Sequence, residues 1–125
     1  MSKINIKILI VEDDLPLQSA LQEAFTNEGF LVLAAGDGQE GLEITKREKP
    51  DLVLVDILLP KMDGITMARE IKKLGLGTLM IFLTNVSDVE HIADASEAAY
   101  ADYLVKSNWS IKDIIGKVKG KLGLT

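Results

Sequence analysis

The sequence contains no cysteine and only one tryptophan and one histidine among its 125 residues. Without cysteine the chain forms no disulfide and offers no thiolate to a metal ion. No apolar run approaches the length of about 18 residues that a membrane-spanning helix needs, and no secretory signal precedes the first apolar segment. Positive charge is not in excess either, since the net charge is −5. These absences predict a cytoplasmic protein that neither inserts into membranes nor binds nucleic acid directly.

Hydrophobic residues make up 47% of the chain and charged residues 26%, a balance typical of compact globular proteins. The length suits one domain, placed at residues 1–125 because no linker, repeat or low-complexity segment divides the chain. Apolar runs with the composition of buried strands lie at residues 6–11, 30–34, 52–55, 79–83 and 103–105.

Segments with helical spacing follow each of these runs. Leu17, Leu21 and Phe25 recur at intervals of four residues, and further helices are predicted around residues 42–44, 65–74, 89–93 and 111–122. Strands that alternate with helices predict an α/β fold with a parallel sheet. The units are too few for an eight-stranded barrel, so we expect an open, doubly wound, five-stranded sheet with five helices. The residues placed to cap helices are Asp14, Asp37 and Ser110.

Polar residues stand at the carboxyl ends of four predicted strands. Glu12 and Asp13 follow the first strand, Asp56 the third, Thr84 the fourth and Lys106 the fifth. Sites in open α/β sheets form at this edge. If the first and third strands are neighbours, their ends lie about 5 Å apart. The three carboxylates would then repel one another unless a hard cation such as Mg²⁺ bridges them.

Each of these residues also has a simpler interpretation when it is taken alone. Glu12 and Asp13 would be ordinary polar residues at a strand end, and Asp56 would begin a turn. Thr84 would be a strand or capping residue, and Lys106 a solvated cation. Their joint position at four strand ends favours a site.

Four segments in order, "ILIVEDD", "LVLVDILLPKMDG", "FLTN" and "DYLVK", resemble the motifs of receiver domains of two-component response regulators. The resemblance extends from about Lys7 to Lys121. It implies a flavodoxin-like (βα)5 fold with strand order 2-1-3-4-5, and a stand-alone, single-domain regulator.

The resemblance also implies roles for the acidic residues. Asp56 resembles the aspartate that accepts a phosphoryl group, and a carboxylate is a competent nucleophile for this transfer. Asp13 resembles the direct Mg²⁺ ligand, Glu12 the acid that acts through water, and the carbonyl of Leu58 the backbone ligand. The remaining chemistry is mainly positioning and charge neutralisation.

Three further residues have family roles. Thr84 and Lys106 resemble the hydroxyl and the ammonium that hold the phosphoryl oxygens. Tyr103 resembles the aromatic residue whose side chain follows the position of Thr84.

The chain departs from the family pattern beside two of these residues. Ser107 follows Lys106 where the family usually has proline in a cis peptide; a non-proline cis bond costs about 2.5–4 kcal/mol, so we expect a trans or rearranged loop at residues 107–109. Asn85, after Thr84, is bulkier than the usual alanine or glycine and would screen the site or donate a hydrogen bond.

Leu58 and Val86 resemble the two residues that, in the family, tune the attack of water on the phosphoaspartate. Both are apolar and neither orients a water molecule, so we expect a long-lived phosphoryl group. His91 is predicted to lie on a solvated helix face, and Trp109 is either a packing residue or part of a partner surface.

The predicted function is a phosphorylation switch. A histidine kinase or phosphotransfer protein would donate the phosphoryl group. Thr84 and Tyr103 would then shift and remodel a face formed by the fourth helix, the fifth strand and the fifth helix, which would bind an unknown downstream protein. The protein would be a monomer or a phosphorylation-dependent homodimer.

Other functions have less support. A pseudo-receiver, a binding or dimerisation module that takes no phosphate, rests only on Ser107 and Asn85. An aspartate-nucleophile phosphatase needs a second acid where Leu58 stands. A flavodoxin needs a hydroxyl-rich loop where Glu12, Asp13 and Asp14 would repel phosphate.

Overall fold

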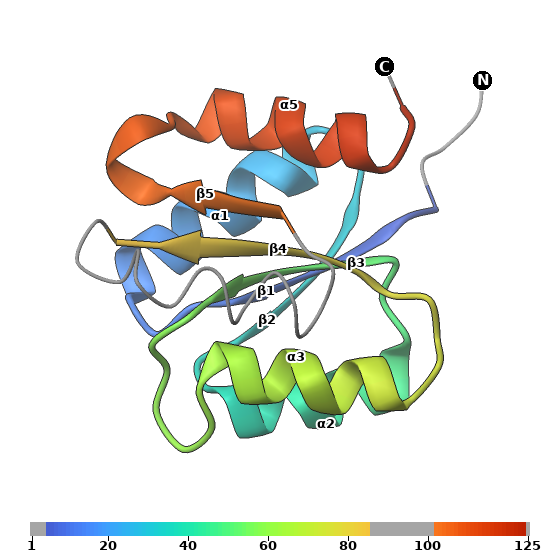
Figure 1. Cartoon of the computed structure of the whole chain (residues 1–125). Helices are drawn as coiled ribbons and strands as arrows, with labels where there is room; N and C mark the ends of the chain where they lie inside the picture. Colours follow the sequence, from blue (N-terminus) through green and yellow to red (C-terminus); the bar gives the residue numbers. More distant parts are fainter. Residues whose placement is uncertain (1–4, 86–101, 125) are drawn as a thin grey trace.

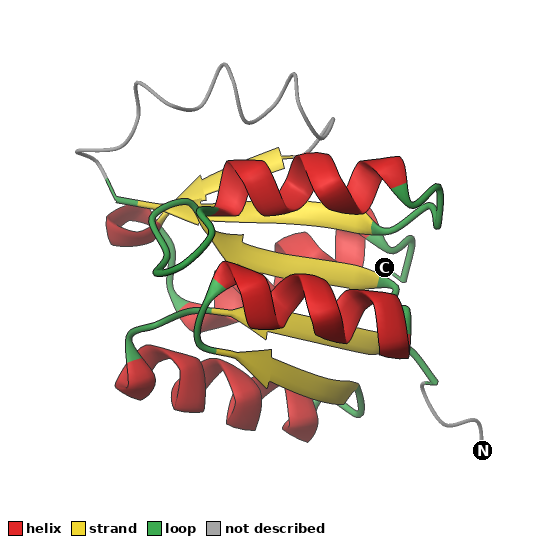
Figure 2. Ribbon diagram, turned by 90° about the horizontal axis from the view of Figure 1, so that it is seen from below, coloured by secondary structure: helices red, strands yellow, loops and turns green. Residues whose placement is uncertain are grey.

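The computed structural model describes residues 5–85 and 102–124, which form a five-stranded parallel sheet with helices on both faces (Figure 1). The order of the strands is β2-β1-β3-β4-β5, as the family resemblance implied. The strands are β1 (Lys7–Val11), β2 (Leu31–Ala35), β3 (Leu52–Asp56), β4 (Leu79–Thr84) and β5 (Asp102–Val105). Figure 2 shows all five arrows pointing the same way, so the carboxyl ends of the strands lie at one edge of the sheet.

The helices cover the sheet in two layers (Figure 1). One layer holds α1 (Leu15–Asn27) and α5 (Ile111–Lys121), and the other holds α2 (Gly38–Glu48) and α3 (Gly64–Lys73). A short 3₁₀ helix, Lys106–Asn108, joins β5 to α5. The helix predicted at residues 89–93 lies outside the described residues, as do Val86 and His91.

The central strand β3 is buried along its whole length. Val53 and Val55 pack into the core beneath α2 and α3, whereas Leu52 and Leu54 pack into the core beneath α1 and α5. This alternation follows from the two-residue period of a strand that is covered on both faces. Each such side chain contributes roughly 2 kcal/mol when it is withdrawn from water. Asp56 therefore ends a strand that is held firmly from both sides.

Polar side chains begin three of the helices. Asp37 accepts a hydrogen bond from the backbone N–H of Glu40 at 2.7 Å, which confirms the predicted cap of α2. Ser110 and Asp113 form a reciprocal capping box at the start of α5. Asp63 caps α3 in the same way as Asp37 caps α2.

The predicted cap at the start of α1 is only partly correct. Asp14 occupies the N-cap position, but its side chain makes no capping hydrogen bond. Pro16, in the first helical turn, has no N–H to donate to it, and the N–H of Leu17 makes no bond to it either. The backbone N–H of Asp14 donates instead to Glu12 Oε2 at 3.1 Å, so Asp14 contributes to the orientation of Glu12.

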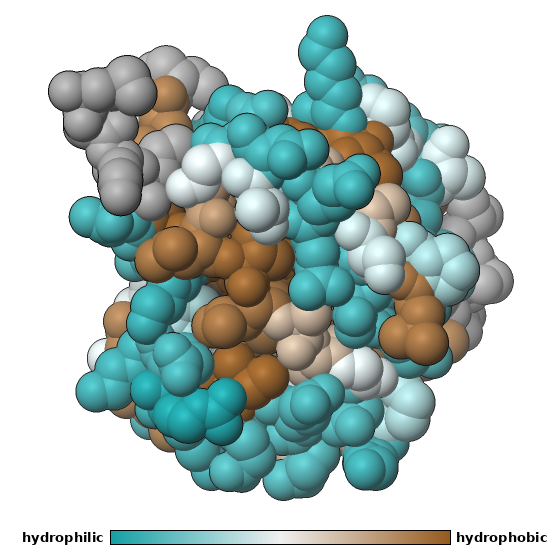
Figure 3. Space-filling model, turned by 180° about the vertical axis from the view of Figure 1, so that it is seen from behind, coloured by the Kyte–Doolittle hydropathy of each residue, from teal (hydrophilic) through white to brown (hydrophobic). Residues whose placement is uncertain are grey.

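The edge strand β2 brings apolar side chains to the surface. Leu31 is 49% exposed, and the next three residues of the strand are half-buried. Seen from behind, apolar side chains form a band across the middle of the molecule, with polar side chains above and below (Figure 3). The opposite edge strand, β5, is more polar and leads into the candidate site.

Candidate functional site

The sheet register brings the predicted site residues to one edge. Val11 pairs with Val55, so Glu12 and Asp13 leave β1 beside the end of β3, where Asp56 stands. Thr84 pairs with Val105 across β4 and β5, so Lys106 leaves the sheet next to Thr84. The predicted adjacency of the first and third strands is confirmed.

Three carboxylates converge at this edge. One oxygen from each of Glu12, Asp13 and Asp56 lies within 4.8 Å of the others. Glu12 is 1% exposed and Asp56 4% exposed, whereas Asp13 is exposed to solvent. Carboxylates at this distance repel one another unless a cation lies among them.

Lys106 is a cation of this cluster. Its Nζ donates to Asp56 Oδ2 at 2.9 Å and lies 2.8 Å from Glu12 Oε1. The side chain of Lys106 is only 18% exposed. The alternative interpretation of Lys106 as a solvated cation is therefore wrong, because its ammonium group is directed into the site.

Burial and ion pairing act in opposite directions on these groups. Burial raises the pKa of Glu12, and the contact with Lys106 offsets this only in part. Burial alone would lower the pKa of Lys106, but its bonds with Glu12 and Asp56 outweigh burial and raise that pKa. Lys106 therefore stays charged at neutral pH, and Glu12 holds a proton more readily than an exposed glutamate.

The two oxygens of Asp56 have different surroundings. Oδ2 accepts the bond from Lys106, while Oδ1 is buried and has no hydrogen-bond partner within the described part of the chain. A buried oxygen without a hydrogen-bond partner lowers the stability of the folded protein. Asp56 Oδ1 is thus an atom of the site that can contact a ligand.

Among the described residues, no hydrogen bond joins Thr84, Tyr103 or Leu58 to Asp56. Thr84 is fully buried, and its hydroxyl donates to the carbonyl oxygen of Asn85 at 3.2 Å. Tyr103 is 44% exposed, and Leu58, two residues beyond Asp56, is 52% exposed. Asn85 is exposed as well.

The link from β5 to α5 agrees with the expectation for Ser107. The described chain contains no cis peptide bond. Lys106 and Ser107 begin the 3₁₀ helix, and Trp109 follows it with 38% of its surface exposed. A trans connection therefore directs Lys106 into the site without the usual proline.

One contact of the site has no clear signal in the sequence. Gly64, the first residue of α3, donates its N–H to the carbonyl oxygen of Ile57 at 2.7 Å. A Cβ atom on Gly64 would lie 2.1 Å from the carbonyl oxygen of Asp56. Only glycine fits here, so α3 packs directly against the backbone that carries Asp56.

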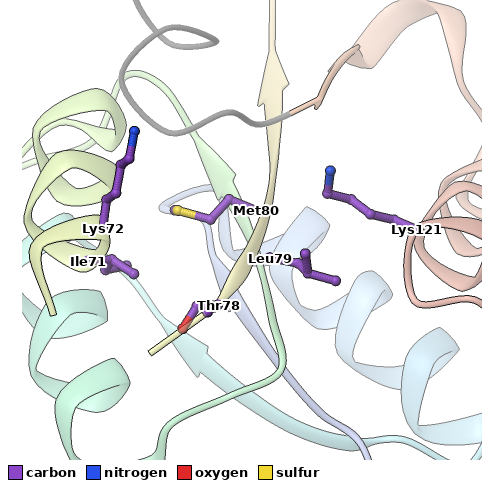
Figure 4. Close-up of a pocket in the computed structure, with 7 residues that line it drawn as sticks. Ile71, Lys72, Thr78, Leu79, Met80 and Lys121 are labelled. Carbon is purple, nitrogen blue, oxygen red and sulfur yellow. The ribbon is translucent and has the colours of Figure 1, made fainter. Parts of the chain in front are cut away.

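A separate pocket lies at the opposite end of the sheet. It has a volume of about 240 Å³ and contains residues at the start of β4, such as Leu79 and Met80. Lys72 and Lys121 lie on either side of that strand (Figure 4). None of its lining residues belongs to the carboxylate cluster.

Among the described helices, none has the length and apolarity that crossing a bilayer requires.

Comparisons with known proteins identify the family. The model of the response regulator receiver domain matches residues 8–119. Sporulation initiation phosphotransferase F of Bacillus subtilis (strain 168) is 33% identical over 121 residues, which cover 97% of each chain. A CheY-like receiver domain protein of known structure from Methanospirillum hungatei JF-1 superposes with a TM-score of 0.89 at 30% identity, over 96% of this chain and 95% of that chain.

Other relatives are longer. The probable transcriptional regulator ycf27 of Porphyridium aerugineum is 34% identical over 116 residues, which are 93% of this chain and 48% of the relative. The chain spans about half the length of several curated relatives that it matches. The family match and the full-length relative agree with the fold and with the order of its strands. The chain belongs to the response regulator receiver domain family.

Proposed function

We propose that this receiver domain accepts a phosphoryl group on Asp56 in a Mg²⁺-dependent reaction. The observation that supports this most directly is the environment of Asp56. One of its oxygens is paired with Lys106, and the other is buried without a partner in the described part of the chain. A carboxylate arranged in this way has a neutralising cation and an oxygen atom available for bond formation.

The donor set fits Mg²⁺. Hard carboxylate oxygens are the ligands that this ion prefers, and three of them lie within 4.8 Å of one another. Asp13, Asp56 and the carbonyl of Leu58 would hold the ion, with Glu12 acting through water. When bound, the ion neutralises charge on the phosphoryl oxygens.

The reaction proceeds on the side chain of Asp56. Its Oδ1 attacks the phosphorus atom of a phosphohistidine, the P–N bond breaks, and the imidazole leaves. The donor is a histidine kinase or a phosphotransfer protein. Lys106 and the hydroxyl of Thr84 hold the phosphoryl oxygens, so the domain catalyses its own phosphorylation as part of signalling.

Loss of the phosphoryl group is slow in this proposal. Leu58 is exposed next to the site but is apolar, so its side chain cannot orient a water molecule for attack on the phosphoaspartate. Val86, the other residue with this expected role, lies outside the described residues.

The output is a change of the surface near β5 and α5. Thr84 moves toward the phosphoryl group, and Tyr103, now 44% exposed, follows it. The altered face binds a downstream protein or a second copy of the domain. The proposed setting is the cytoplasm.

The features that suggested a pseudo-receiver do not disturb the site. Ser107 lies in a trans 3₁₀ helix that leaves Lys106 bonded to Asp56. Asn85 is exposed, and its carbonyl oxygen accepts the hydroxyl of Thr84. Both observations support the phosphorylation proposal over a module that takes no phosphate.

Intact-mass measurement tests the proposal. The protein is incubated with a small acyl phosphate, with and without Mg²⁺. One phosphoryl adduct is expected, and it should disappear in Asp56→Asn and in the absence of Mg²⁺. Asp51→Asn, which alters an exposed aspartate just before the same strand, is the matched control and should retain the adduct. An adduct on Asp56→Asn, or none on the unaltered protein, would refute the proposal.

A further inference from the structure

The loop between β3 and α3, residues 57–63, carries Leu58 and is held at its base by Gly64. Gly64 donates its N–H to the carbonyl oxygen of Ile57 at 2.7 Å. This bond joins the two ends of the loop. Leu58 lies beyond it, toward the tip, so the position of its carbonyl group depends on what holds the tip.

The tip of this loop lies against the N-terminus of α2. The carbonyl oxygen of Pro60 accepts the N–H of Met62 at 2.7 Å and the N–H of Gly38 at 3.4 Å. Lys61, the residue between Pro60 and Met62, has a φ of 66°. Such a tight turn is strained in a residue other than glycine. Lys61 Nζ lies 3.7 Å from Asp37 Oδ2, at the N-cap of α2. Contacts with α2 therefore hold a strained turn in place.

Gly38 allows the loop and α2 to approach this closely. It is buried, and a Cβ atom on it would lie 1.9 Å from the carbonyl oxygen of Met62 and 2.7 Å from the carbonyl carbon. Both distances are far shorter than van der Waals contact. Gly36, in the same turn before α2, differs, because a Cβ atom there would meet nothing within 4 Å. Of these two glycines, only Gly38 is required by the packing of the loop.

We propose that Gly38 is a positioning residue for the metal site, because it lets α2 hold the β3–α3 loop where the carbonyl of Leu58 can reach the ion. This inference rests on the proposed function, which assigns that carbonyl to the metal site. The path from the tip to Leu58 is short and stiff. The ring of Pro60 fixes its own φ, and Leu59, which precedes a proline, is restricted to extended conformations.

Calorimetric titration of the full chain with MgCl₂ tests this role without measuring phosphorylation. Gly38→Ala pushes the loop away from α2 and should weaken Mg²⁺ binding about tenfold, the lower range for the loss of a group that orients a ligand. Gly36→Ala adds the same methyl group to open space and is the matched control. It should change the affinity by less than about twofold. Unchanged affinity in Gly38→Ala, or an equal loss in both variants, would overturn the inference.

Titration with CaCl₂ separates a displaced ligand from a general loss of folded protein. Mg²⁺ requires nearly ideal octahedral geometry, whereas Ca²⁺ accepts longer and more variable bonds. Gly38→Ala should therefore weaken Ca²⁺ binding by less than about threefold. Equal weakening for both ions would mean that Gly38 acts on stability and not on the position of the ligand, and would overturn the inference.

Met62→Ala tests the same contact if Gly38→Ala does not fold. The side chain of Met62 packs against the core beneath α2 and α3, so its removal loosens the tip of the loop without a backbone overlap. Mg²⁺ binding should weaken by about threefold, and Ca²⁺ binding should again change less. Unchanged Mg²⁺ affinity in this variant would also overturn the inference.

The titrations also separate this inference from the proposed function. If the unaltered protein binds no Mg²⁺, the metal proposal is wrong and the positioning role fails with it. If the unaltered protein binds Mg²⁺ and Asp13→Asn does not, but Gly38→Ala binds as tightly as the unaltered protein, only the positioning role is wrong.

Discussion

Lysine and aspartate meet at two places in this domain, with opposite balances of charge. At the carboxyl edge of the sheet, Lys106 lies between Glu12 and Asp56, and Asp13 adds a third carboxylate. Between β5 and α5, Asp102 lies 3.6 Å from Lys117 and 3.3 Å from Lys121. The first cluster has too few cations, and the second has more cations than carboxylates.

The ion pairs of the two clusters differ in strength because one cluster is buried and the other is exposed. The side chain of Asp102 is 46% exposed, so water screens its ion pairs, and such pairs contribute only about 0–1 kcal/mol. The side chain of Asp56 is 6% exposed, so its pairing with Lys106 is screened far less. The exposed cluster holds β5 and α5 together weakly. The buried cluster is costly to assemble, as expected for carboxylates withdrawn from water.

The space around glycine also differs between the carboxyl edge of the sheet and α5. A Cβ on Gly64 would lie 2.1 Å from the carbonyl oxygen of Asp56, whereas a Cβ on Gly116 in α5 would meet nothing within 4 Å. The carboxyl edge is packed backbone against backbone, and the outer face of α5 is open. Equal substitutions should therefore have opposite effects.

The largest effect is expected from Gly64→Ala. The added methyl group overlaps a backbone carbonyl that cannot rotate away, so the start of α3 must move from β3. We expect the free energy of unfolding to fall by about 3 kcal/mol, the upper range for overpacking. Urea denaturation measures this change, and phosphorylation of Asp56 should slow because its backbone is displaced.

Gly116→Ala is the matched control for this substitution. Gly116 is exposed within α5, and alanine favours a helix interior over glycine by about 1 kcal/mol. The free energy of unfolding should therefore rise. A similar loss of stability in both variants would mean that the carboxyl edge is not packed more tightly than α5.

A smaller effect, of opposite sign, is expected from Asp13→Asn. Asp13 is exposed and lies with Glu12 and Asp56 in a group of like charges. Removing its charge without Mg²⁺ should raise the free energy of unfolding by about 1 kcal/mol, the size of a well-screened Coulomb interaction at short range. Thermal denaturation in a chelating buffer measures the gain.

With Mg²⁺ present, the unaltered protein should be more stable than Asp13→Asn. The unaltered protein should gain stability from a bound ion, whereas Asp13→Asn lacks one of the proposed ligands and should gain less. Asp14→Asn is the control, because Asp14 is next to Asp13 in the chain but is not one of the three grouped carboxylates. Its free energy of unfolding should stay within about 0.5 kcal/mol of that of the unaltered protein, with and without Mg²⁺. Destabilisation by Asp13→Asn in the chelating buffer would contradict the interpretation of the cluster as a set of repelling charges.

The sequence predicted the sheet and the place of the site because both depend on local patterns. The continuous apolar run before Asp56 is typical of a strand that is covered on both faces, and β3 is buried throughout. Residues that end parallel strands must meet at one edge, so the convergence of Asp56 with Glu12 and Asp13 followed from strand order. That order came from the family resemblance, because spacing alone does not determine it.

The details of the site depend on contacts between distant residues, and the sequence did not reveal them. Lys106 and Asp56 are 50 positions apart, and nothing near Lys106 indicates that it also reaches Glu12. The close approach of Gly64 to Asp56 depends on how α3 packs. Pro16 removes one of the two N–H groups that could donate to the Asp14 side chain, but nothing in the sequence shows why the N–H of Leu17 makes no such bond.

The smallest effect is expected at the exposed cluster, from Asp102→Asn. Burial alone would raise the pKa of Asp102, but Lys121 and Lys117 outweigh it and lower this pKa below its ordinary value of 3.8. A carboxyl group whose pKa is lower in the folded state stabilises the fold above the ordinary pKa, and this contribution is lost as the pH falls through the folded-state pKa. Asp102→Asn should therefore lower the free energy of unfolding at pH 7 by less than about 1 kcal/mol.

The loss of stability in Asp102→Asn should depend on pH and on salt, because it comes from lost ion pairs. The difference between Asp102→Asn and the unaltered protein should narrow below about pH 4, where the carboxyl group becomes protonated in both states. It should also shrink in 1 M salt, where the Debye length is about 3 Å. Urea denaturation across pH measures both changes, and Asp102→Asn should have no effect once Lys117→Met and Lys121→Met have removed its partners. A loss that persisted at low pH would mean that Asp102 stabilises β5 through packing rather than charge, and the contrast between the two clusters would then rest on burial alone.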